Sequence, residues 1–146
     1  MRIARATIDD LDELAPLFDA YRQFYKQPAD IELAKSFLLQ RLQNHDSVLF
    51  LARDGERPVG FTQLYPSFTS AGCARIYILN DWYVEAEQRG RRVGQGLLNA
   101  ACDFGRSEGA VRLTLSTAVD NHLAQGVYEA AGWKRSDAFI TYNYAL

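Results

Sequence analysis

The chain has 146 residues, of which 48% are apolar and 23% are charged, and its formal net charge at pH 7 is −2. This length and composition are typical of one globular domain that buries a sizeable core. The slight excess of acidic residues argues against bulk attraction to nucleic acid or to an anionic membrane.

Local patterns exclude further classes. Cys73 and Cys102 fit no metal-binding or redox spacing, so we expect no metal site and a reducing, cytoplasmic location. The N-terminal residues turn acidic at Asp9-Asp10, which is too early for a signal peptide. No apolar run approaches the roughly 20 residues that a membrane-spanning helix needs.

The first third of the chain is predicted to hold a short strand and two helices. Residues 2–6 form the strand, and the spacing of Thr7 and Asp10 is typical of a helix start. Asp30 is expected to cap the second helix, after a break at Gln27-Pro28. Apolar residues recur at helical spacing in the first helix, at Leu11, Leu14, Phe18, Tyr21 and Tyr25.

Three strands are predicted next. Residues 47–53 and 59–65 form a hairpin around the turn at Asp54-Gly55, a loop covers 66–72, and the third strand covers 73–84. A strict alternation in the third strand places five residues on one face, namely Ile76, Ile78, Asn80, Trp82 and Val84.

The remainder is predicted as a helix over 92–107, a strand over 111–117, a helix capped by Asp120 or Asn121, and a closing strand over 140–146. This order predicts a mixed α/β sheet covered by helices. The closing strand could pair across a homodimer, and the sequence leaves the oligomeric state open.

The turn before the third helix carries the strongest chemical signal. It reads Arg89-Gly90-Arg91-Arg92-Val93-Gly94 and opens directly into an amphipathic helix. Unpaired N–H groups at a helix N-terminus and the helix dipole favour an anion. Glycine allows the backbone to approach that anion, and arginine adds charged, forked donors. The turn therefore predicts a site for a phosphorylated ligand, with a solvated basic turn as the alternative.

The order of elements, this turn and the later residues Asn121, Tyr128 and Gly132 together resemble the GNAT superfamily of N-acetyltransferases. Its phosphate-binding signature is Gln/Arg-x-x-Gly-x-Gly/Ala, and Arg92 stands at the first signature glycine. We expect Arg92 to adopt the backbone angles of a helical first turn. The resemblance implies a mixed, mostly antiparallel central sheet with helices on both faces, in a single domain over residues 1–146.

Residues 77–84 and 121–128 are similar to the diamine and polyamine acetyltransferase branch. That resemblance implies acetyl-CoA as cofactor and acetyl transfer to a primary amine of a small molecule by direct attack on the thioester. The alternatives are a peptide or protein amine as acceptor, or a non-catalytic acyl-CoA-binding module. Asn80 replaces a glutamate of that branch, and an amide cannot act as a base.

The resemblance also assigns roles to residues. Asn121 contacts the cofactor near its thioester, and Tyr128 is the general acid, because a phenol with a pKa of about 10 stays protonated at neutral pH. These two residues lie seven positions apart, so a helix presents both on one face. A plain helix cap and a core tyrosine are the alternatives. The backbone at Trp82, Tyr83 and Val84 holds the pantetheine arm, and the pyrophosphate lies on Arg89, Gly90, Arg91, Arg92, Val93, Gly94 and Gln95.

The acceptor side is predicted less sharply. Asn80, Asp81 and Tyr25 are the candidate substrate-binding residues. Deprotonating a lysine-like amine at pH 7 costs about 4–5 kcal/mol, so a carboxylate should assist. The candidates for that base are Asp81, Glu85 and Asp120.

Overall fold

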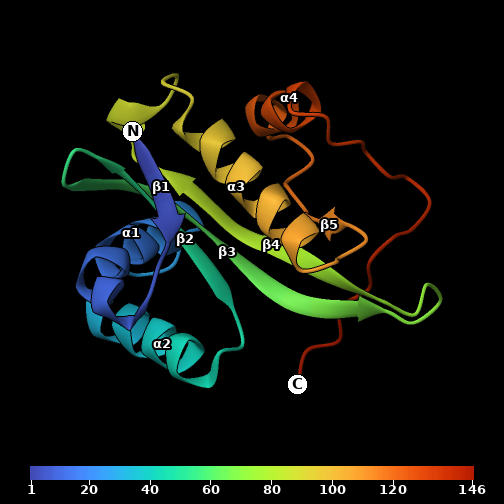
Figure 1. Cartoon of the computed structure of the whole chain (residues 1–146), viewed down its shortest axis with the longest axis horizontal. Helices are drawn as coiled ribbons and strands as arrows, with labels where there is room; N and C mark the ends of the chain where they lie inside the picture. Colours follow the sequence, from blue (N-terminus) through green and yellow to red (C-terminus); the bar gives the residue numbers. More distant parts are fainter. The chain divides into compact units, whose positions relative to one another are not determined.

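A five-stranded sheet with the strand order β1-β2-β3-β4-β5 organises the first of two compact units, Met1–Ser116 (Figure 1). The computed structural model describes all residues from 1 to 146, and the second unit is Thr117–Leu146. The strands are β1 (Arg2–Arg5), β2 (Val48–Asp54), β3 (Arg57–Thr69), β4 (Ala74–Val84) and β5 (Leu113–Thr114). The helices are η1 (Ile8–Asp10), α1 (Leu11–Phe24), α2 (Ile31–Asn44), η2 (Ala86–Gln88), α3 (Val93–Ser107) and, in the second unit, α4 (His122–Ala130), where η marks a short 3₁₀ helix.

Strands β1 to β4 run antiparallel to their neighbours, and β5 runs parallel to β4. A parallel pair needs a long crossover, and α3 supplies it between β4 and β5. The mixed, mostly antiparallel sheet expected from the sequence is thereby confirmed.

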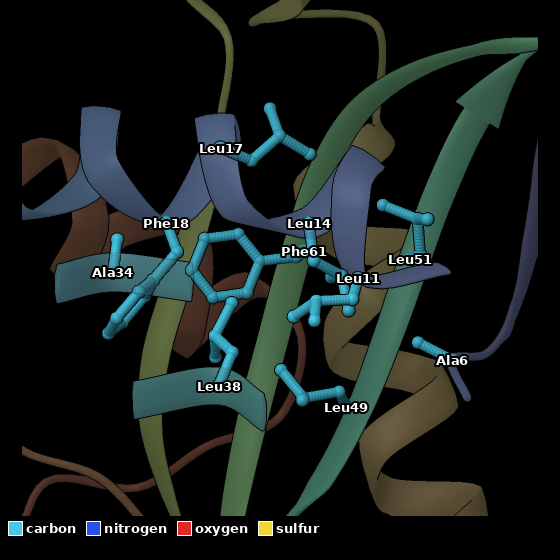
Figure 2. Close-up of a cluster of buried hydrophobic side chains, with 10 residues drawn as sticks. All are labelled: Ala6, Leu11, Leu14, Leu17, Phe18, Ala34, Leu38, Leu49, Leu51 and Phe61. Atoms are coloured by element: carbon cyan, nitrogen blue, oxygen red, sulfur yellow. The ribbon is translucent and has the colours of Figure 1, made fainter. Parts of the chain in front are cut away.

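The helices of the first unit cover both faces of its sheet (Figure 1). In β3, Phe61 packs edge-on against Phe18 of α1, with ring centroids 6.0 Å apart. The adjacent Gly60 lies against Leu97 of α3. Successive strand residues point to opposite faces, so α1 and α3 lie on opposite sides. Figure 2 shows the buried cluster under α1 and α2, formed by Ala6, Leu11, Leu14, Leu17, Phe18, Ala34, Leu38, Leu49, Leu51 and Phe61.

Side chains cap the N-termini of η1 and α2, which lie on the α1 side of the sheet. Thr7 and Asp10 form the predicted capping box, but it opens one turn of η1 before α1 proper starts at Leu11. Asp30 caps α2 as predicted, since its Oδ1 accepts from Leu33 N at 3.1 Å. Buried Asp19 of α1 accepts in turn from Asp30 N at 3.0 Å, which joins α1 to the start of α2.

Two strand predictions need correction. Strand β3 does not end at residue 65 but continues to Thr69, because Pro66 and Ser67 still pair with β4. The predicted strand over 111–117 shortens to Leu113–Thr114, which pairs with Tyr77 and Ile78 only. The β3–β4 hairpin is therefore longer than predicted. Because β5 is short, the C-terminal part of β4 has no neighbouring strand on that edge.

The second unit contains α4, and Asn121 is its N-cap. The predicted strand over Ile140–Leu146 is wrong, because these residues form neither strand nor helix. A strand needs a hydrogen-bonded neighbour, and no sheet pairing includes them. The homodimer stays a prediction. None of the helices combines the length and hydropathy needed to cross a bilayer.

Candidate active site

Strand β4 carries a β-bulge at Asn80. Gln63 of β3 pairs with Asp81, whereas the next residue, Leu64, pairs with Leu79, so Asn80 is the extra residue. The bulge reverses the alternation of side chains along the strand. The prediction that Ile76, Ile78, Asn80, Trp82 and Val84 share one face is therefore wrong.

Contacts with α3 show that reversal directly. Tyr77 packs against Phe104 of α3, with ring centroids 5.2 Å apart. Trp82 also faces α3, because its Nε1 donates to the carbonyl of Gly94 at 2.9 Å. An odd and an even position on one face require an inserted residue between them. The insertion leaves Asn80 exposed and Asp81 buried.

Beyond the bulge, the backbone of β4 has one open edge. The carbonyl of Asp81 faces β3, where it accepts from Thr62 Oγ1 at 2.7 Å. The carbonyl of Tyr83 also faces β3, and a Cβ on Gly60 would lie only 2.8 Å from it. By the same alternation, Trp82 and Val84 direct their backbone groups to the opposite edge. No strand pairs there, because β5 ends opposite Ile78.

This geometry separates the three backbone positions predicted for the pantetheine arm. Trp82 and Val84 direct their backbone groups to the edge past the end of β5, whereas the carbonyl of Tyr83 faces β3. The carbonyl of Val84 also accepts from Arg89 Nε at 3.1 Å, which ties the turn after β4 to the strand.

The N-terminus of α3 presents three backbone donors. Val93, Gly94 and Gln95 occupy the first three helical positions, and such positions have no acceptor within the helix. Gly96 is already bonded, to the carbonyl of Arg92 at 3.0 Å. No side chain caps this helix, so the donors remain available to an anion.

Arg92 differs from the prediction. It does not adopt helical angles but the left-handed conformation, with φ 64° and ψ 15°. The chain enters the turn extended at Arg89 and must reverse before α3 begins, and Gly90 also has positive φ, at 83°. A left-handed residue with a side chain is strained, which explains why glycine is typical of this position in the family signature.

The three arginines of the turn have different partners. Arg89 lies over the ring of Phe24, with its Cζ 6.0 Å from the ring centroid. Arg91 donates to Gln88 Oε1 at 2.9 Å and pairs with Asp54 at 3.4 Å. The exposed side chain of Arg92 takes part in none of the hydrogen bonds or ion pairs within the chain. It is therefore a cation available to a ligand.

Gly94 is required by the packing of α3 on β4. A Cβ at this position would lie 2.6 Å from Cζ2 of Trp82, closer than real Cβ atoms approach. The absent side chain lets the indole pack on the first turn of α3, next to the open amides. Together, the open amides, the arginines and the open edge of β4 fit a diphosphate followed by a linear amide-containing arm.

The side chain of Asp81 lies on the opposite face of the sheet from α3, the face that α1 covers. It is 2% exposed and accepts hydrogen bonds from the amides of Gln63 and Asn80, the latter at 2.8 Å. Burial raises the pKa of its carboxyl, and the hydrogen bonds from Asn80 and Gln63 offset part of that increase. The bulge at Asn80 places this carboxyl on the α1 face and not on the α3 face.

The other two candidate bases have different surroundings. Glu85 is held in an ion pair with Arg57 at 2.6 Å. Asp120 belongs to the second unit, in the turn before α4. Sequence reasoning missed Gln63, although a polar residue within the apolar strand around it was a visible signal.

In the second unit, Asn121 and Tyr128 lie at the two ends of α4. The Oδ1 of Asn121 accepts from Ala124 N at 3.2 Å, so this residue is a helix cap, as one of the alternatives proposed. The ring of Tyr128 lies 6.3 Å from that of Trp133, measured between centroids.

Comparison with known proteins identifies the class. Residues 12–133 match the model of the Acetyltransferase (GNAT) family. The chain is 43% identical to the uncharacterized N-acetyltransferase YhfO of Bacillus subtilis (strain 168), over 97% of this chain and 95% of that protein. A crystal structure of a probable acetyltransferase superposes with a TM-score of 0.94 at 44% identity and covers 100% of this chain and 98% of that one.

A more distant structure shows the fold alone. The aminoglycoside N-acetyltransferase AAC(6')-Iy in complex with CoA has a TM-score of 0.84 at 19% identity, over 99% of this chain and 95% of that one. The chain belongs to the GNAT family of acetyltransferases and is an acetyltransferase. Acetyl-CoA is the cofactor of this family. None of these relatives points to the diamine and polyamine branch.

Proposed function

We propose that the chain is an acetyl-CoA-dependent N-acetyltransferase that acts on a primary amine of a small molecule by direct attack on the thioester. The observation that supports this most strongly is the N-terminus of α3, which no side chain caps, beside the part of β4 that extends past the last pairing with β5. When bound, acetyl-CoA supplies the activated acetyl group, and the residues of the chain bind, orient and exchange protons.

The pyrophosphate is assigned to the turn and the first turn of α3. The amides of Val93, Gly94 and Gln95 supply uncharged donors aligned with the helix dipole. Arg89, Gly90, Arg91 and Arg92 complete this phosphate site, and Arg92 is its unpaired cation.

The pantetheine arm is assigned to the open edge of β4. The backbone groups of Trp82 and Val84 extend the sheet by one more hydrogen-bonded chain, as peptides do when they add to a sheet edge. Tyr83 is left out of this set because its carbonyl faces β3. We assign the thioester end of the arm to Asn121.

Asp81 is assigned as the group that receives the proton of the ammonium, through water. Because the pKa of this carboxyl is raised, it lies closer to a neutral working pH than that of an ordinary aspartate. A general base is most effective when its pKa is near the working pH. Asn80 and Tyr25 are assigned to the amine side with it. Tyr128 is assigned as the acid that protonates the leaving thiolate.

These assignments treat residues 1–146 as one catalytic domain, although the chain forms two compact units. The family model supports that view, because residues 12–133 cross the boundary at Ser116. A peptide or protein amine remains the second candidate acceptor.

Substitution of Tyr128 by Phe tests the proposal. Loss of the acid should lower kcat by about tenfold or more, while the Kd for acetyl-CoA stays within about twofold, because general acids contribute roughly 10²–10⁴-fold. Thiol release measures kcat, and calorimetric titration measures Kd. A matched control is Tyr142→Phe, which removes the same hydroxyl from an exposed tyrosine. Unchanged turnover in Tyr128→Phe would remove the acid from the mechanism.

A further inference from the structure

Two tyrosines, Tyr21 and Tyr65, lie near Asp81 on the α1 side of the sheet. Tyr21 donates its hydroxyl to the carbonyl of Asn80 at 3.3 Å, at the bulge itself. Burial together with the charge of Asp81 raises the pKa of Tyr21, and the same two causes raise the pKa of Tyr65 to about 12. The phenols and the carboxyl therefore occupy one neighbourhood.

This neighbourhood reaches solvent through the end of α1. The ring of Tyr25 lies 5.0 Å from that of Tyr21, and the ring of Phe24 lies 5.3 Å from that of Tyr25. Tyr25 is 51% exposed and Phe24 is 56% exposed. An aromatic surface thus leads from solvent to a buried acidic group, and we name Phe24, Tyr25 and Tyr21 the aromatic shelf.

Asp81 is the carboxylate of this region that lacks a cationic partner. Its hydrogen bonds come from the side-chain amides of Gln63 and Asn80, and none of the ion pairs of the chain includes it. Asp46, which also acts on Tyr65, is paired with Arg41 at 3.0 Å. Gln63 supplies a second unsatisfied group, because its buried Oε1 accepts no hydrogen bond.

One uncompensated negative charge matches one ammonium group. A buried carboxylate without a counter-ion is costly, and an ammonium with three N–H donors satisfies both the carboxylate and an orphaned amide oxygen. A second ammonium on the same acceptor would lose water without gaining a counter-charge. Aromatic faces attract cations and cover apolar carbon at the same time.

We propose that the acceptor is a monocationic primary amine with an apolar or aromatic body, in preference to polyamines and aminoglycosides. This inference rests on the proposed function and narrows its substrate. The ammonium binds beside Asp81 and Gln63, and the apolar body lies on the aromatic shelf.

Matched amines separate the two parts of the proposal. With the full chain and saturating acetyl-CoA, initial rates of thiol release give kcat/KM for 2-phenylethylamine, n-butylamine, 1,4-diaminobutane and kanamycin. n-Butylamine and 1,4-diaminobutane share a carbon skeleton and differ by one ammonium group. We expect n-butylamine to exceed 1,4-diaminobutane and kanamycin by about tenfold or more. We expect 2-phenylethylamine to exceed n-butylamine by about three- to tenfold.

A variant of the shelf provides the second readout. Tyr25→Ala should raise KM for 2-phenylethylamine by about three- to tenfold and KM for n-butylamine less, because the shorter amine covers less of the shelf. Phe68→Ala is the control, because it removes another exposed ring, 66% accessible, from the far end of β3. Circular dichroism and thermal melting establish that both variants are folded.

The outcomes distinguish this inference from the function on which it rests. Higher kcat/KM for 1,4-diaminobutane or kanamycin than for n-butylamine overturns the inference and leaves the acetyltransferase proposal intact. A Tyr25→Ala variant with unchanged KM for 2-phenylethylamine overturns the role of the shelf. Transfer to no amine at all, with acetyl-CoA still bound, overturns both.

Discussion

Arg92 combines strain with an unpaired charge at one residue. Its left-handed backbone, with φ 64°, is the geometry in which glycine carries no steric penalty. Its exposed guanidinium has no acceptor within the chain. A residue that is unfavourable for the fold and well placed for an anion is expected where function outweighs stability.

Arg92→Gly should therefore change stability and affinity in opposite directions. Relief of the strain should raise the free energy of unfolding by about 1 kcal/mol. Loss of the charged donor should raise the Kd for acetyl-CoA about three- to tenfold at low salt, and the difference should shrink at high salt. Urea denaturation and calorimetric titration measure the two effects. Arg92→Lys retains both the charge and the strain, so it should resemble the wild type; equal affinity of Arg92→Gly and wild type at low salt would contradict the assignment.

Asp81 makes a prediction about pH. Burial raises the pKa of its carboxyl above its usual value, so the folded state holds this proton more tightly than the unfolded chain does. The stabilisation from the protonated form is complete below the unfolded pKa of about 4 and is lost as pH rises through the folded pKa. Over that window, wild-type stability should fall with pH relative to Asp81→Asn, as measured by urea denaturation at each pH.

The rate of acetyl transfer should rise with pH, whereas stability falls. The base must be ionised to accept a proton, so the wild-type rate should rise through the same pH window, and Asp81→Asn should lose that rise together with most of its turnover. For the stability prediction, the contradicting outcome is the same dependence of stability on pH in the wild type and in Asp81→Asn. That result would show that this carboxyl titrates alike in the folded and unfolded chain.

At the level of elements, the sequence predicted what local periodicity and capping determine. The helical spacing in α1 and the capping residues Thr7 and Asp30 rest on contacts within a few residues, and the structure confirms them. The start of α3 follows from local sequence for the same reason, whereas the left-handed backbone of Arg92 does not.

The elements that failed depend on partners far away in the chain. The bulge at Asn80 is a register shift against Gln63 and Leu64, and no pattern within β4 encodes it. Extension of β3 past Pro66 likewise depends on its pairing with Tyr77. These long-range pairings place Asp81 in the interior, and no pattern within a few residues of it predicts that burial.

At the level of the whole molecule, the hydrophobic core and the proposed acid belong to different units. Apart from Ala124, all the buried apolar residues lie within Met1–Ser116. The complete sheet, α3 and the turn that precedes it are in that unit as well. Asn121 and Tyr128 lie in Thr117–Leu146.

A chain ending at Ser116 should therefore fold but not catalyse. A unit of this size with its core intact is large enough to unfold cooperatively, and its open amides and β4 edge should still bind acetyl-CoA. Without Tyr128 to protonate the thiolate, amine-dependent thiol release should fall by about 10²-fold or more. Thermal melting, calorimetric titration and thiol release measure the three properties, with the full-length Tyr128→Phe variant as the comparison. If the truncated chain transfers acetyl groups at a near-native rate, the second unit contributes no catalytic group, and the proton must come from Met1–Ser116 itself.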